Sequence, residues 1–158
     1  MTASDPRVEL RKTLRVPKDE VFRAWTTPEL MAQWMAPGPK SVLTSTVDLR
    51  VGGSYQIHMK GEMSGRAYDV RIRGTYERIV PNELLSFTWG YEDPERRKSV
   101  GTSVVTVLLK TVPEGTELTL IHSRIATEER RRGHLEGWTG SLEQLDHFLS
   151  QRGKGKEA

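Results

Sequence analysis

The sequence predicts an α+β domain in which an antiparallel sheet of seven strands curves around one long C-terminal helix. One observation is the alternation of apolar and polar residues that recurs through residues 41–123 and is typical of half-buried strands. A helix with a single apolar side must bury that side against another element, and such a sheet provides the surface. The other observation is an apolar stripe at helical spacing, formed by Leu135, Trp138, Leu142, Leu145 and Leu149.

Length and composition are those of one domain with a sizeable core, expected over residues 7–150 of the 158. No apolar run approaches the roughly 20 residues that a membrane span needs. The absence of cysteine excludes disulfides, thiolate catalysis and cysteine-ligated zinc. The N-terminal residues carry no charged-then-apolar signal, so we expect a cytoplasmic protein.

Residues 7–16 alternate between apolar and polar side chains, which predicts a first strand with one buried face. Lys12 falls on the apolar side of that alternation. It could pair with a ligand anion inside a cavity, or it could reach solvent at a strand end or bulge.

Two short helices are expected to follow and to close one end of the curved sheet. Pro17 begins the first, with Asp19 and Glu20 in the turn where the helix dipole favours acids. Pro28 begins the second, expected over Leu30–Met35. Residues 36–39, Ala-Pro-Gly-Pro, end it because proline cannot continue a helix.

The remaining strands run between residues 42 and 123. The connections between them are expected to be turns at residues 52–53, 81–83 and 113–115, and loops at residues 61–65 and 92–101. Their expected inward positions are Tyr55, Ile57 and Met59; Val70, Ile72, Tyr76 and Val80; Leu85, Phe87, Trp89 and Tyr91; Val105, Val107 and Leu109; and Leu118, Leu120 and His122.

The last helix has a start signal and an ambiguous end. Thr127 is a suitable N-cap, and Glu128 and Glu129 follow it in the first turn. Residues 151–158 include the Gly-Lys repeat at 153–156, so we expect them to form a disordered tail.

A set of short motifs in fixed order resembles the activator-of-Hsp90-ATPase homologue branch of the START-like superfamily, also called the SRPBCC or Bet v 1-like fold. The resemblance covers about residues 7–150 and implies a helix-grip fold with a cavity between helix and sheet. Family members include lipid and polyketide binders, some cyclases and a co-chaperone domain, so fold alone does not give function. The motifs lie at residues 21–25, 28–34, 48–53, 74–78 with 85–89, 118–122 and 136–138.

His122 is the most distinctive polar residue, because it shares the inward parity of Leu118 and Leu120. It could orient a ligand or act as a general acid or base. It could equally be a buried histidine satisfied by one hydrogen bond. No serine, cysteine or carboxylate is tied to it by local spacing.

Two further features have both a structural and a functional interpretation. Trp89 and Trp138 are the better candidates for a cavity wall, whereas Trp25 and Trp34 are expected to hold the short helices in place. Gly137 and Gly140 each cost roughly 1 kcal/mol inside a helix relative to alanine. Close packing against the sheet would explain them, and we favour it slightly over space left for a ligand.

The runs Arg96–Lys98 and Arg130–Arg132 are expected to lie at the same end of the sheet, near the mouth of the cavity. They could form an electropositive entrance that attracts an anionic ligand or acidic partner, or they could be solvated loops. No aromatic strand motif accompanies them, so nucleic acid is not the expected partner. The four histidines have no metal-ligand spacing, and no phosphate-binding glycine motif is present, so no metal or cofactor is expected.

The sequence therefore predicts a cavity that binds a hydrophobic or amphipathic small molecule without catalysing a reaction. A protein-interaction module with a chaperone partner, by family analogy, is the first alternative. An enzyme of the cyclase or hydrolase kind with His122 as base is the second, and both monomer and homodimer remain open. The expected walls are Tyr55, Ile57, Ile72, Tyr76, Phe87, Trp89, Val105, Val107, Leu120, His122, Trp138, Leu142 and Leu145.

Overall fold

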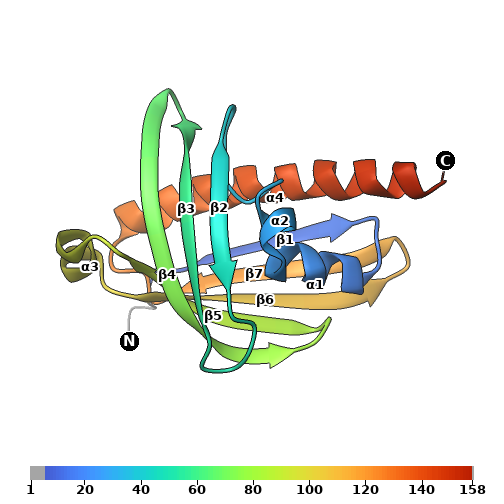
Figure 1. Ribbon diagram of the computed structural model, residues 1–158, viewed down its shortest axis with the longest axis horizontal. Helices are drawn as coiled ribbons and strands as arrows, with labels where there is room; N and C mark the ends of the chain where they lie inside the picture. The colour runs from blue at the N-terminus through green and yellow to red at the C-terminus, as the bar shows by residue number, and fades with distance from the viewer. Residues whose placement is uncertain (1–5, 158) are drawn as a thin grey trace.

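A computed structural model of the chain confirms an antiparallel seven-stranded sheet that curves around a long C-terminal helix (Figure 1). It describes residues 6–157, with side chains up to residue 152. The elements in chain order are β1 (Val8–Leu14), α1 (Lys18–Thr26), α2 (Pro28–Met31), β2 (Val42–Val47), β3 (Ser54–Met63), β4 (Arg66–Val80), β5 (Leu84–Tyr91), α3 (Pro94–Val100), β6 (Ser103–Val112), β7 (Gly115–Ser123) and α4 (Glu128–Glu157).

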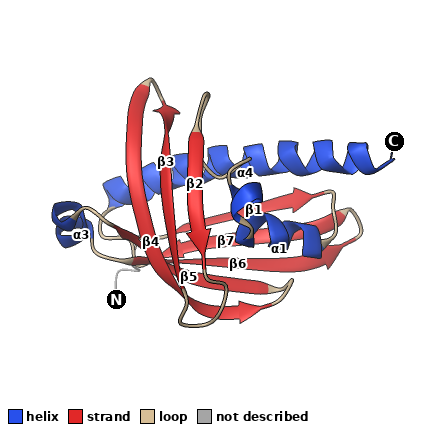
Figure 2. Ribbon diagram, in the orientation of Figure 1, coloured by secondary structure: helices blue, strands red, loops and turns tan. Residues whose placement is uncertain are grey.

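The strand order β1-β7-β6-β5-β4-β3-β2 makes every strand from β2 to β7 the neighbour of the next one in the chain. Only β1 departs from this meander, because it pairs with β7, the last strand in the chain. β2, β3 and β4 run at a steep angle to β5, β6 and β7 in Figure 2, so the sheet bends strongly and α4 crosses it. This bend provides the concave face on which α4 lies.

The connection between β3 and β4 is a two-residue turn, and the expected loop over residues 61–65 is wrong. Both strands extend to the turn, with Met63 paired to Arg66. Ser64 and Gly65 have φ angles of 53° and 76°, the positive values that tight hairpin turns of this kind require. Gly61, which we assigned to a loop, instead lies within β3 opposite Tyr68.

Residues 94–100 form helix α3, so the expected loop over residues 92–101 is also wrong. Asp93 is the N-cap: its carboxylate accepts a hydrogen bond from the Arg96 backbone N–H at 3.3 Å. Pro94 occupies the first turn, and Gly101 ends the helix at φ 75°. A proline in the first turn also begins α2 at Pro28, as predicted, but α2 ends at Met31 and the expected extent to Met35 is wrong.

A β-bulge in β4 reverses the expected facing of Val80. Tyr76 pairs with Phe87, but Arg78 already pairs with Ser86, so one extra residue is inserted in β4. After the bulge Ile79 packs against the core, whereas the Val80 side chain is 39% exposed. The inward position that we expected at Val80 is therefore wrong.

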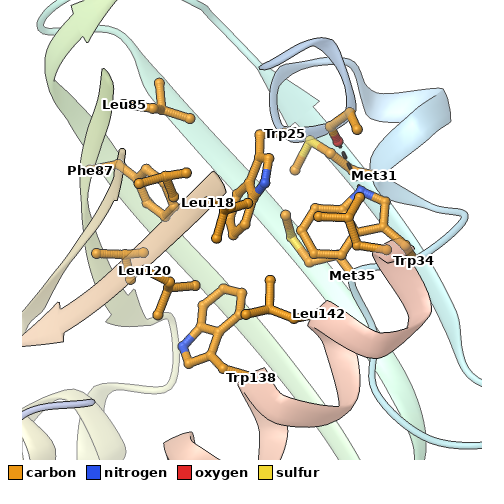
Figure 3. Packing of buried hydrophobic residues seen from close by; sticks show 14 of the residues in the cluster. Trp25, Met31, Trp34, Met35, Leu85, Phe87, Leu118, Leu120, Trp138 and Leu142 are labelled. Atoms are coloured by element: carbon orange, nitrogen blue, oxygen red, sulfur yellow. Dashed lines mark hydrogen bonds between the residues drawn. The ribbon is translucent and has the colours of Figure 1, made fainter. Parts of the chain in front are cut away.

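The C-terminal half of α4 packs tightly on the sheet. Leu142, Leu145 and Leu149 are buried, as the helical stripe predicts. Figure 3 shows Trp138 and Leu142 projecting from α4 towards Trp25 and the sheet. The short helices are held from within, because the Trp34 indole N–H donates to the Ala24 carbonyl oxygen at 3.0 Å.

Polar side chains attach α4 to the segment that follows α2. The Gln144 amide donates to the carbonyl oxygens of Trp34 and Ala36 at 2.7 and 2.8 Å, and its oxygen accepts from the Gly38 N–H at 3.0 Å. The Ser141 hydroxyl donates to the Met35 carbonyl oxygen at 2.7 Å. These bonds satisfy backbone groups that a proline- and glycine-containing segment cannot pair within regular structure.

The ends of α4 and the position of Lys12 complete the fold. The Thr127 hydroxyl accepts from the Arg130 N–H at 3.1 Å, which confirms the predicted N-cap. Lys12 is half-buried, and its ammonium lies 3.7 Å from an Asp146 carboxylate oxygen on α4. Residues 151–157, expected to be a disordered tail, continue α4. Within residues 6–157, none of the helices combines the length and apolarity needed to cross a membrane.

Because Leu145 is completely buried between α4 and the sheet, Leu145→Ala should lower the free energy of unfolding by about 2–5 kcal/mol. Leu108→Ala is the matched control, since Leu108 lies on β6 with 37% of its surface exposed, and it should cost under about 1 kcal/mol. Urea unfolding of both variants measures the difference. Equal losses would show that α4 does not depend on this contact.

Candidate ligand pocket

A pocket of about 390 Å³ lies between the N-terminal half of α4, the strands β3 to β5 and α3. Its volume is within the range of roughly 300–1,000 Å³ that small-molecule sites occupy. It reaches solvent beside Glu129 and Gly133, which are both exposed. The lining residues are Met35, Pro37, Met59, Met63, Tyr68, Val70, Ile72, Trp89, Tyr91, Arg96, Glu129, Arg130, Gly133, His134, Gly137, Trp138 and Ser141.

Two glycines on α4 make room for this pocket. A Cβ added at Gly133 would meet no atom within 4 Å, and one at Gly137 would meet only the Met63 sulfur at 4.0 Å. Both glycines line the pocket and lie one helical turn apart. Open space, and not close packing, therefore surrounds Gly137. At Gly140 a Cβ would meet the Pro37 Cβ at 3.5 Å, an ordinary contact, so the close packing that we favoured for both positions requires glycine at neither.

The sheet side of the pocket is apolar, with one unsatisfied polar group. Met59, Val70 and Ile72 lie on β3 and β4, and Trp89 comes from β5. The Trp89 indole N–H is buried and has no acceptor among the described residues. A buried donor without a partner costs about 1–3 kcal/mol, so a ligand oxygen within reach would relieve a real penalty.

The structure divides the expected wall residues into three groups. Ile72, Trp89 and Trp138 line the pocket. Tyr55, Ile57, Tyr76 and Phe87 surround a second void of only about 10 Å³, which is too small for more than one water. Their role in binding, like that of the whole set, stays a prediction. The third group is buried in the core and lines neither space: Val105, Val107, Leu120, His122, Leu142 and Leu145.

His122 is completely buried directly behind the pocket wall, and both of its ring nitrogens have partners. The Trp138 indole N–H donates to Nδ1 at 3.0 Å. Because an indole N–H can only donate, Nδ1 must carry the lone pair and Nε2 the proton. Nε2 therefore donates to the Ser103 hydroxyl oxygen at 2.6 Å, and Ser103 lies 3.4 Å from the Trp89 carbonyl oxygen.

This tautomer is the opposite of the one that a serine–histidine catalytic pair needs. A general base would accept the Ser103 proton on Nε2, whereas here Nε2 is the donor. Burial lowers the pKa of His122 to about 2, with a smaller contribution from His134. The imidazole is thus a neutral connector between β6, β7 and α4, and the geometry gives no support for His122 as a base.

His134 is the histidine that reaches the pocket. Its ring centroid lies 4.2 Å from that of His122, and it lines the pocket together with other residues of α4. Burial and the nearby Arg130 guanidinium lower the pKa of His134 to about 4. At neutral pH it is an uncharged group that makes no hydrogen bond to the described residues, so it is free to bond a ligand.

The two basic runs meet at the pocket, as the strand order predicted. Arg96 from α3 and Arg130 from α4 both line it, and Figure 1 places α3 beside the first turn of α4. Arg97 instead donates to the carbonyl oxygens of Tyr91 and Glu92, and Arg131 pairs with Glu128 at 2.8 Å. Only part of each run therefore faces the pocket.

Several lining residues were not recognised from the sequence. Met63 lies within the segment that we took for a loop, and Tyr68 follows it on the same parity as Val70 and Ile72. Met35 and Pro37 lie after the end of α2, where no periodicity exists to indicate which way a side chain points. Across residues 6–157, no three metal-ligating side chains gather into a possible metal site.

A curved antiparallel sheet gripping a long helix, with a pocket at one end of the helix, defines the helix-grip class of the START-like superfamily. The chain belongs to the family described as "Activator of Hsp90 ATPase homolog 1-like protein", whose model matches residues 15–150. None of the curated proteins compared matches it. The family fold is compatible with small-molecule binding and with chaperone-associated modules.

Solved structures of bacterial proteins share this fold. A protein from Nitrosomonas europaea has a TM-score of 0.76 at 24% identity, with 97% of this chain and 99% of that chain covered. One from Chromobacterium violaceum has a TM-score of 0.75 at 25% identity, with 91% and 96% covered. A structure from Silicibacter pomeroyi titled as an AHSA1 protein has a TM-score of 0.77 at 23% identity, with 92% and 99% covered.

The buried His122 should make stability depend on pH. Its pKa is about 2 in the fold against 6.5 in an unfolded chain, so between these values only the unfolded state binds the proton. Stability should therefore fall as pH drops below about 6.5, by about 1.4 kcal/mol per pH unit from this residue.

Nitrogen NMR of the imidazole checks the same point directly. The His122 ring should stay neutral, with the proton on Nε2, down to about pH 4 while the fold persists. A proton on Nδ1, or titration near the ordinary value, would contradict the tautomer deduced from the Trp138 bond.

Proposed function

We propose that the chain binds a hydrophobic or amphipathic small molecule in the pocket between α4 and the sheet, and that the pocket serves binding and not catalysis. The observation that supports this most directly is the pair of glycines at 133 and 137. They line about 390 Å³ of space although a Cβ at either position would fit. Each glycine costs roughly 1 kcal/mol relative to alanine in a helix interior, and packing does not require it.

The composition of the wall fits an amphipathic ligand. Three methionines, Met35, Met59 and Met63, give the pocket flexible and polarisable side chains that adapt to different ligand shapes. Trp89 and Trp138 add large rigid surfaces. Polar groups among these residues include the Trp89 N–H, the His134 ring and the two guanidinium groups.

The side chains in and behind the pocket do not support the alternative that the protein is an enzyme. His122 is buried behind the wall with both nitrogens bonded, and the Ser103 hydroxyl is inside the core. Nucleophilic catalysis needs a nucleophile and a base that both reach the substrate. His134 reaches the pocket, but no described carboxylate hydrogen-bonds to it and orients its ring.

A larger side chain at Gly137 distinguishes an effect on ligand binding from an effect on folding. Gly137→Leu should place an apolar side chain in the pocket and weaken the binding of decanol at least about tenfold, because the ligand loses the space it occupies. The same change should leave the free energy of unfolding equal or higher, since leucine is a better helix former than glycine. The change in tryptophan fluorescence on addition of decanol measures binding, and urea unfolding measures stability.

Thr139→Leu is the matched control, because it adds a leucine to the exposed side of the same helix two residues away. It should leave decanol binding unchanged. If the native protein binds neither decanol nor other apolar probes, or if Gly137→Leu binds as well as the native protein, the proposal is wrong and an interaction module on the outer surface becomes the better explanation.

A further inference from the structure

We propose that the pocket selects amphipathic anions: molecules with an apolar body for the wall of α4 and the sheet, and one carboxylate or phosphate end for Arg96 and Arg130. This inference rests on the proposed function and names the class of ligand. It concerns the groups at the mouth of the pocket, which come from α3 and the first turn of α4.

Arg96 is held in place without being neutralised. Its guanidinium lies over the Tyr91 ring, 4.8 Å from the centroid, and both residues line the pocket. Stacking on an aromatic face fixes the plane of the guanidinium and leaves its N–H donors available. Among the described residues, no carboxylate lies within 4 Å of it to form an ion pair.

Arg130 approaches the same space from the other side. Its charge is close enough to His134 to lower the pKa of that imidazole. It too has no ion-pair partner within the described part of the chain, although the two arginines that follow it do. Arg131 and Arg132 both lie within ion-pair distance of Glu128, so that carboxylate pairs with arginines that do not line the pocket.

Anchoring within α3 keeps Arg96 at the mouth. The Arg97 side chain donates to the backbone oxygens of Tyr91 and Glu92 at 3.0 and 2.8 Å, which ties α3 to the end of β5. The Asp93 cap holds the first turn of α3, in which Arg96 lies. Two guanidinium groups on separate, anchored elements form a site for the planar, two-oxygen end of a carboxylate or for a phosphate.

The one acid at the mouth limits how the anion is placed. Glu129 also lines the pocket and is exposed, so its carboxylate stays hydrated at the entrance. An anion bound between Arg96 and Arg130 would therefore direct its apolar body inward. Below it lie Met59, Ile72 and the two tryptophans. A cationic amphiphile would meet two unpaired positive charges against one negative charge and should be rejected.

The experiment compares decanoate, decyl phosphate, decanol and decyltrimethylammonium, which share one apolar chain and differ in charge. The protein variants are the native chain, Arg96→Met with Arg130→Met, and the control Lys98→Met with Arg132→Met. The control changes the net charge equally on the same two helices but leaves the pocket lining intact. Isothermal titration at low and high salt measures each affinity.

The native protein should bind both anions at least about tenfold more tightly than decanol, and salt should weaken the anions alone. The pocket double variant should lose this preference while keeping its affinity for decanol, and the control double variant should retain the preference. Comparison of decanoate with decyl phosphate then identifies the head group.

Three results would overturn the inference. Equal affinity for decanoate and decanol in the native chain would do so while leaving the proposed function intact. An equal loss in both double variants would assign the preference to net charge and not to these two residues. Acetate or inorganic phosphate binding as tightly as the decyl compounds would remove the apolar part of the ligand class. Failure of all four decyl compounds to bind would instead reject the proposed function itself.

Discussion

The hydrogen bond from the Trp138 indole to Nδ1 of His122 is the contact on which the arrangement of helix and sheet depends. Trp138 is 5% exposed and His122 is not exposed at all, so losing the bond would leave two polar groups without water. It fixes the distance between α4 and β7 at one point along the helix. Through Nε2 it also connects to Ser103 on β6.

This contact divides α4 into two halves with different roles. On its C-terminal side the helix is bound closely to the fold by buried leucines and by the Gln144 amide. On its N-terminal side the inward positions are Gly133 and Gly137, together with His134 and Arg130, and the helix stands away from the sheet. The tight half allows the open half, because the packed core can hold α4 in position without help from the residues that border the pocket.

The sequence was sufficient for most of the fold because the fold depends on periodicity. The alternation along β5 and β7 determines which side chains of each strand point inward. The helical stripe that ends at Leu149 does the same for α4. The errors arose where one residue changes the pattern. The extra residue after Tyr76 reversed the facing of Val80. Residues 94–100 had no apolar periodicity, so only the Asp93-Pro94 start signal could have identified α3.

The candidate site was harder to predict because it depends on distances between elements. Parity placed His122 inside the domain, but it could not show that Ser103 and Trp138 occupy both ring nitrogens. The same parity treated Leu120 and Trp89 alike, although only Trp89 borders the pocket. The sequence did predict that the two basic runs would meet, since in a meander the relevant connections lie at one end of the sheet. Which arginine of each run faces inward depends on the caps and ion pairs around it.

Three features that are unfavourable for the protein by itself lie at the same pocket. Gly133 and Gly137 weaken α4, the Trp89 N–H is buried without an acceptor, and Arg96 and Arg130 place two positive charges at one mouth. Each of these features also occurs singly in proteins for structural reasons. The amphipathic anion that we propose would offset all three, by filling the space beside the glycines and supplying oxygen acceptors and negative charge. The closely packed half of α4, centred on Leu145, supplies the stability that lets the other half remain open.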